Sequence, residues 1–130
     1  MARLLVLCSI ALGVSGMSAV AAPATERDRA YVEYKLYDAM NEAFWDGSAS
    51  NAKMACEAAK VVVARLDPSE FMDAELAECF GYAAEVEKDI AAACRWWEQA
   101  IARYRLASRQ GRVPTLQSTF LTQEWSRNEC

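Results

Sequence analysis

The segment between Asp89 and Arg109 carries two neighbouring stripes of apolar residues at the 3.6-residue spacing of an α-helix. The stripes consist of Ile90, Cys94, Trp97, Ile101 and Tyr104, and of Ala93, Trp96 and Ala100. Charged and amide side chains occupy the opposite side of the segment. A helix with two adjoining apolar stripes packs between two neighbours. The pattern therefore predicts that Trp96 and Trp97 fill packing interfaces and do not form a ligand-binding box.

The same spacing recurs along most of the chain and predicts an all-α fold. We expect five helices, over roughly residues 27–46, 51–66, 69–86, 89–109 and 115–127. Asp67 and Pro68 have the layout of a helix start, with Asp67 as the N-cap. Asp89 is a candidate cap for the helix that follows it. The short Val61–Val63 run is the one strand-like feature after the first 22 residues.

The predicted helix over 69–86 also has two apolar faces. Ala77, Phe80, Gly81 and Ala84 form one face, and Met72, Leu76, Cys79, Ala83 and Val86 form the other. We expect Gly81 to allow a close approach to Ala93 on the next helix, because glycine has no Cβ. Cys79 is expected to face the preceding helix.

The first 21 residues have the layout of a secretory signal peptide. Arg3 precedes an apolar run, and the small-residue sequence Ala19-Val20-Ala21 ends it. An uncleaved membrane anchor is the alternative, but Ser and Gly dilute the run. We expect cleavage after Ala21, which leaves one domain over residues 22–130 in the periplasm or outside the cell. No stable membrane insertion is expected after cleavage.

Charge and composition exclude several kinds of function. The chain has 18 acidic and 14 basic residues and a net charge of −4, which argues against non-specific nucleic-acid binding. It contains no histidine, so Cys/His zinc sites and histidine general bases are excluded. It also contains no CxxC motif. We expect no metal, no cofactor and no catalytic residue; paired carboxylates such as Glu75 and Glu78 leave an enzyme as an alternative, although helix surfaces present such pairs routinely.

Four cysteines remain after the predicted cleavage: Cys56, Cys79, Cys94 and Cys130. An even number in an exported chain predicts two disulfides. In an antiparallel hairpin, two residues that are equally many positions from the turn lie at the same level along the two helix axes. Two pairs have their midpoints at predicted turns and agree with the direction of Cys79, namely Cys56–Cys79 and Cys94–Cys130. The alternative, Cys79–Cys94 with Cys56–Cys130, is also symmetric about a turn but conflicts with that direction.

An internal repeat suggests how the helices are organised. The sequence Ala-Cys, seven residues, Ala-Arg begins at Ala55 and again at Ala93, an offset of 38 residues. A period in this range is typical of stacked helical hairpins.

The second copy resembles a tetratricopeptide or Sel1-like repeat in the positions of Phe80, Gly81, Asp89, Ala93, Trp96, Trp97 and Ala100. The chain departs from that pattern at Ala84, where the family has tyrosine, and in lacking the glycines of the Sel1 inter-helix loop. The resemblance covers roughly residues 35–106. It implies two antiparallel hairpins in a right-handed stack, with the last helix as a cap, that bind proteins without catalysis.

Two helix faces combine aromatic and polar side chains and are candidates for recognition. The first contains Tyr34, Asp38, Asn41 and Trp45, and the second contains Glu75, Glu78, Tyr82 and Glu85. In tetratricopeptide-like stacks the first helix of each hairpin lines the concave groove. The resemblance therefore implies one acidic, aromatic groove lined by both faces, suited to a cationic peptide or protein segment. Ordinary solvated faces are the alternative.

The expected function is a secreted or periplasmic protein–protein interaction module that binds a peptide or protein partner in a helical groove. A small-ligand carrier and a structural subunit of an envelope complex are the alternatives. The sequence specifies neither the partner nor the oligomeric state.

Overall fold

The computed structural model describes residues 20–109, 121–123, 125, 126 and 128–130. The described part is helical, with one isolated β-bridge and no strand. Its elements are α1 (Glu26–Asn41), the π-helical turn η1 (Glu42–Asp46), α2 (Ala49–Val63), α3 (Glu70–Val86) and α4 (Ile90–Arg109). The predicted helix over 115–127 lies largely outside the described residues, of which 121–123, 125 and 126 are helical.

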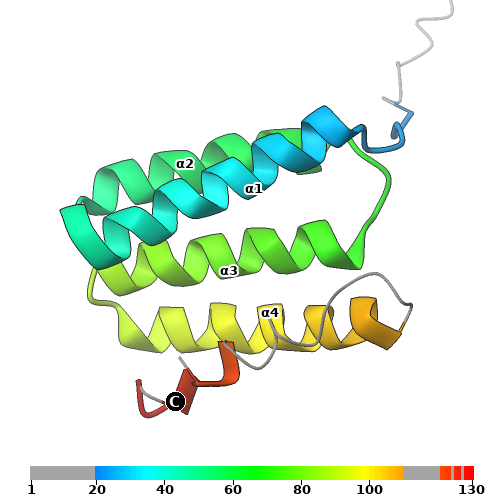
Figure 1. Ribbon diagram of the computed structural model, residues 1–130. Coiled ribbons are helices and arrows are strands. Elements are labelled where there is room, and N and C mark those ends of the chain that lie inside the picture. The colour runs from blue at the N-terminus through cyan, green and yellow to red at the C-terminus, as the bar shows by residue number, and fades with distance from the viewer. Residues whose placement is uncertain (1–19, 110–120, 124, 127) are drawn as a thin grey trace, which may run out of the picture.

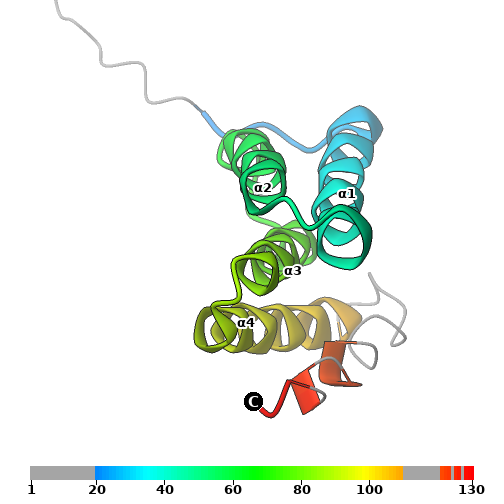
Figure 2. The same ribbon diagram turned by 90° about the vertical axis from the view of Figure 1, so that its left-hand side faces the viewer.

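Helix α3 lies at the centre of the arrangement (Figures 1 and 2). Helices α1 and α2 pack against each other, and both pack against α3. Helix α4 packs against α3 alone among these helices and touches neither α1 nor α2. Successive helices run in opposite directions (Figure 1). The result is a central helix with a helix pair on one side and a single helix on the other.

Side-chain caps set where the helices begin. Thr25 and Asp28 form a capping box before α1. The Ser69 hydroxyl accepts a hydrogen bond from the Met72 N–H at 3.3 Å and caps α3. The Asp89 carboxylate accepts one from the Ala92 N–H at 3.0 Å, as expected for the cap of α4. Asp67 does not cap α3; Ser69 lies two residues closer to the helix and takes that role.

A backbone bridge ties the segment before α1 to the connection between α2 and α3. The Ala22 N–H donates to the Arg65 carbonyl at 3.3 Å, and the Asp67 N–H donates to the Ala22 carbonyl at 2.7 Å. This bridge binds the backbone of Asp67 to the segment before α1, and α3 begins three residues later, at Glu70.

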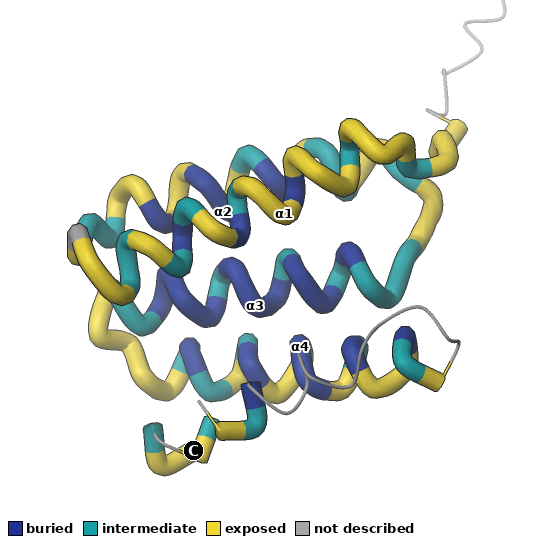
Figure 3. Tube along the Cα trace, in the orientation of Figure 1, coloured by how far each residue is buried: buried dark blue, intermediate teal, exposed yellow. Residues whose placement is uncertain are grey.

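Burial is concentrated on α3 (Figure 3). Ten of its residues are buried: Met72, Ala74, Glu75, Ala77, Glu78, Cys79, Gly81, Tyr82, Ala83 and Ala84. One core cluster joins α3 to α4 around Trp97 and Tyr104 and includes Leu121. A second cluster joins α1, α2 and α3 around Leu36 and Tyr82. Contact with three helices leaves α3 little surface, so even its polar residues enter the interior.

Gly81 makes the close approach between α3 and α4, but its neighbour is Trp97. A Cβ atom at Gly81 would overlap the indole Nε1 and Cδ1 atoms of Trp97, which is fully buried. The three atoms nearest to that position all belong to the indole, so the missing side chain of Gly81 makes room for a large ring. The expected close approach to Ala93 stays a prediction.

Two disulfides connect the helices as predicted. Cys56 on α2 is bonded to Cys79 on α3, and Cys94 on α4 is bonded to Cys130. The bond to Cys56 of α2 confirms that Cys79 faces the preceding helix, and both cysteines are buried. No helix in the described residues is long and apolar enough to cross a membrane.

Candidate binding groove

A groove runs along α3 between α2 and α4. Its volume is about 480 Å³. The floor consists of Leu76, Ala77, Phe80, Ala83 and Ala84 of α3. The walls consist of Lys53, Glu57 and Lys60 of α2 and of Ala92, Trp96, Gln99 and Arg103 of α4. Residues three and four apart share one face of a helix, which is why each helix presents a row of side chains to the groove.

The groove exists because α2 and α4 do not meet across α3. Phe80 on the floor and Trp96 on the α4 wall are stacked, with ring centroids 5.0 Å apart and planes 24° apart. Both rings are only partly buried. A stacked aromatic pair at the edge of an apolar floor offers contact area to a ligand at little cost in side-chain entropy.

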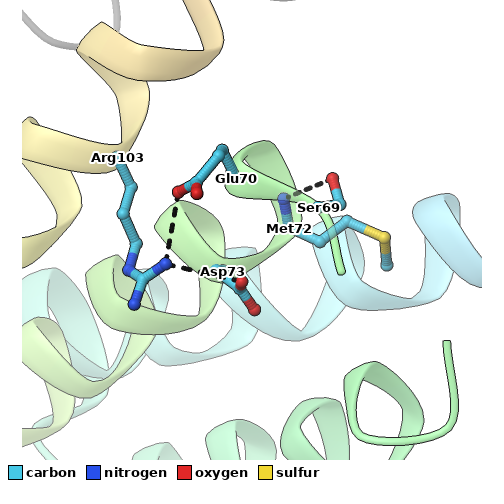
Figure 4. Close-up of polar contacts among 5 residues, drawn as sticks. All are labelled: Ser69, Glu70, Met72, Asp73 and Arg103. Atoms are coloured by element: carbon cyan, nitrogen blue, oxygen red, sulfur yellow. Dashed lines mark hydrogen bonds and ion pairs between the residues drawn. The ribbon is translucent and has the colours of Figure 1, made fainter. Parts of the chain in front are cut away.

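Ion pairs fix two of the basic side chains at the rim. Arg103 lies 3.2 Å from a Glu70 oxygen and 3.5 Å from an Asp73 oxygen, next to the Ser69 cap (Figure 4). Lys53 lies 3.9 Å from Glu87. Partial burial raises the pKa of Asp73, and the attraction of Arg103 opposes that effect. The rim is therefore a set of partly neutralised charges around an apolar floor.

The two other charged residues on the α2 wall form no ion pair with the part of the chain that the structure describes. Glu57 and Lys60 lie one helical turn apart, and both are exposed. Neither forms an ion pair with another described residue. These two charges are available to an approaching ligand.

The four predicted site residues on the first helix lie outside this groove. Trp45, in η1, is 83% exposed, and Tyr34 is 60% exposed. Asp38 and Asn41 line a separate polar hollow between α1 and α2. The Lys35 ammonium lies 5.4 Å from the centroid of the Tyr34 ring and 3.5 Å from an Asp38 oxygen. Tyr34 and Asp38 thus share Lys35 as a neighbour on the outer surface.

The three predicted site residues on α3 face the interior instead of an exposed groove. Glu78 and Tyr82 are buried, and Glu85 is half-buried. The Tyr82 ring makes edge contacts with Phe44 at 5.8 Å and with Trp97 at 6.3 Å. The described residues do not combine the seven predicted positions into one surface. The physical reason is that α3 is flanked by three helices, so one polar face of α3 is covered.

A cluster of buried acidic and phenolic groups lies on that covered face. The Tyr104 hydroxyl donates a hydrogen bond of 2.6 Å to Glu78. Burial raises the pKa of Tyr104, and the negative charge of Glu78 adds to this effect. Burial also raises the pKa of Glu75 from its ordinary value of 4.5 to about 8, with contributions from Glu33 and Glu78. The Glu75 Oε2 atom has no hydrogen-bond partner among the described residues. At neutral pH the Glu75 carboxyl therefore retains its proton.

In the described residues no group of three or more Cys, Asp and Glu side chains is placed to hold a metal ion. The groove residues that sequence reasoning did not select are Leu76, Phe80 and Trp96, which were all assigned to packing.

Comparison of the chain with protein families, with curated protein sequences and with solved structures found no match.

Proposed function

We propose that this protein is an exported binding module that holds a segment of a partner protein in the groove between α2 and α4. The observation that carries the proposal is the groove with its stacked Phe80–Trp96 pair, whose rings the described helices leave partly exposed. Partly exposed aromatic side chains in a concave apolar site are the usual anchors of protein recognition. The charged residues at the rim would orient the bound partner segment.

Export is part of the same proposal. The predicted signal peptide supports it, and so do the two disulfides, since such bonds form and persist in oxidising compartments. The resemblance to tetratricopeptide and Sel1-like repeats also supports protein binding. The proposed groove lies on the opposite side of α3 from Glu78 and Tyr82, so Leu76, Phe80 and Trp96 replace them as contact residues.

The test compares Trp96→Ala with Leu106→Ala, an exposed apolar residue of the same helix that lies outside the groove. Partners are captured from an extract of the source cells, identified by mass spectrometry and purified, and their affinity for each variant is then measured. Loss of an aromatic anchor is expected to weaken binding roughly tenfold or more. Leu106→Ala is expected to bind as the wild type does. Equal binding by the wild type and a correctly folded Trp96→Ala variant would rule out the groove.

A small-ligand carrier is a second candidate, because the groove volume falls within the range of small-molecule sites. Native mass spectrometry of the protein purified from its source separates the two. A bound small molecule that Trp96→Ala releases favours the carrier, whereas a bound polypeptide favours the binding module.

A further inference from the structure

The floor of the groove offers a ligand no backbone hydrogen bonds. It is a face of α3, whose N–H and C=O groups bond along the helix. The described residues also contain no strand that an incoming strand could extend. An extended peptide pressed onto this floor would lose hydrogen bonds to water without replacing them. An α-helix satisfies its own backbone and presents only side chains to the floor.

The dimensions of the groove set the length of such a helix. The lining positions run from Asp73 of α3 to Glu87, the C-cap residue of that helix, which spans about 21 Å at a rise of about 1.5 Å per residue. A helix of about 14 residues, or four turns, covers that length. The two walls are themselves helices that do not contact each other, so the ligand helix would lie between them above α3.

The charges on the α2 wall specify the flank of the ligand helix. Glu57 and Lys60 are exposed, lie one turn apart and form no ion pair with described residues. Lys53 and Arg103, by contrast, are already paired with acids. A ligand helix that complements this wall has a basic residue beside Glu57 and an acidic residue beside Lys60.

We propose that the groove binds an amphipathic α-helix of about four turns whose flank carries one basic and one acidic residue a single turn apart. This inference rests on the proposed function, because it names the form of the partner segment at the same groove.

The experiment uses the disulfide-intact protein and fluorescein-labelled 14-residue peptides, with fluorescence anisotropy as the readout. The first peptide has a leucine face and a Lys/Glu pair on one flank that matches Glu57 and Lys60. The second has the two charges exchanged, and the third has the composition of the first with two central prolines. Each peptide is made with the charges on either flank, to cover both directions in which a helix can lie.

The matched peptide is expected to bind saturably, and the proline peptide roughly tenfold or more weakly, because proline breaks the helix. The double variant Glu57→Lys with Lys60→Glu is expected to shift the preference to the charge-exchanged peptide by roughly tenfold, since two exposed pairs become repulsive. The control is Glu98→Lys with Arg105→Glu, two exposed α4 residues outside the groove. It carries the same charge changes and is expected to leave the preference unaltered.

Two outcomes overturn the helical inference. If the proline peptide binds as tightly as the matched peptide and Trp96→Ala abolishes both, the groove binds extended segments and the proposed function stands. If no peptide binds while a captured natural partner still loses affinity on Trp96→Ala, the four-turn helix is again wrong and the groove function stands. Insensitivity of both the peptides and the natural partner to Trp96→Ala removes the proposed function itself.

Discussion

Gly81 shows how one missing side chain positions an entire helix. The Trp97 indole occupies the space where a Cβ atom of any other residue would lie. Trp97 is fully buried and its ring is rigid, so it cannot move aside cheaply. The contact between α3 and α4 therefore depends on glycine at this position.

Gly81→Ala is expected to destabilise the protein by roughly 2–3 kcal/mol or more, because overpacking in a core exceeds the gain of about 1 kcal/mol in helix propensity. Guanidinium unfolding of the single variant and of Gly81→Ala in a Trp97→Leu background measures this. The cost is expected to shrink when the indole is absent, as coupling between contacting residues requires. An equal cost in both backgrounds would show that the indole is not its cause.

The buried Glu75 carboxyl makes stability depend on pH. Its pKa is about 8 in the folded protein against an ordinary value of 4.5, so the folded chain holds a proton that the unfolded chain has lost between these values. The contribution of this proton to the free energy of unfolding is thus fully present below about pH 4.5. It falls as the pH rises and levels off above about pH 8. Each pKa unit corresponds to about 1.4 kcal/mol, so the total fall amounts to a few kcal/mol.

Glu75→Gln is expected to remove this dependence, because an amide does not ionise. Urea unfolding at pH 5 and pH 8 would show a stability loss in the wild type that is much smaller in the variant. Glu57→Gln, at an exposed position, is the control and is expected to follow the wild type. Parallel behaviour of Glu75→Gln and the wild type across this range would contradict a raised pKa at Glu75.

At the scale of the helices, the start of α3 shows which of two nearby residues, Asp67 or Ser69, is its N-cap. The Ser69 hydroxyl bonds to the Met72 N–H, whereas the Asp67 N–H bonds to Ala22 in the preceding segment. Ser69→Ala is expected to cost about 1 kcal/mol, the usual effect of losing an N-cap. Asp67→Ala keeps its backbone bond and is expected to cost much less. Chemical unfolding of both variants measures the difference, and the reverse order would restore Asp67 as the cap.

Helical spacing predicted the four described α-helices and the disulfide pairing. The direction of a side chain around a helix follows from its position in the repeat, so Cys79 could be assigned to the side that faces α2. The number of residues between each cysteine and the turn then gave its position along the helix axis. Both quantities are properties of single helices and short connections, which is why they can be read without knowledge of the whole fold.

The candidate site was much harder to predict, because exposure depends on how many neighbours a helix has. Glu78 and Tyr82 are at positions that would be solvated on a helix with two neighbours, but α3 has three. Leu76 and Phe80 are apolar and were therefore assigned to packing, but they line the groove that the neighbouring helices leave open. Spacing orders the residues around a helix, but it does not specify which side remains open.

At the scale of the whole molecule, α3 is the helix on which the others depend. It contacts α1, α2 and α4, while α4 touches neither α1 nor α2. Local opening is expected to begin in elements with fewer packed neighbours. Hydrogen-exchange mass spectrometry should find the slowest exchange in α3 and faster exchange in α1 and α4. Exchange in the centre of α3 as fast as in the centre of α1 would contradict this order.

The two disulfides differ in how far a thiol can reach them. Cys56 and Cys79 are buried, whereas Cys130 is exposed and Cys94 is half-buried. Thiol–disulfide exchange requires direct attack on a sulfur atom, so access controls which bond is reduced first. In a mildly reducing medium we therefore expect a form that has lost only the Cys94–Cys130 bond. In that form α2 and α3, which carry one wall and the floor of the groove, remain covalently joined.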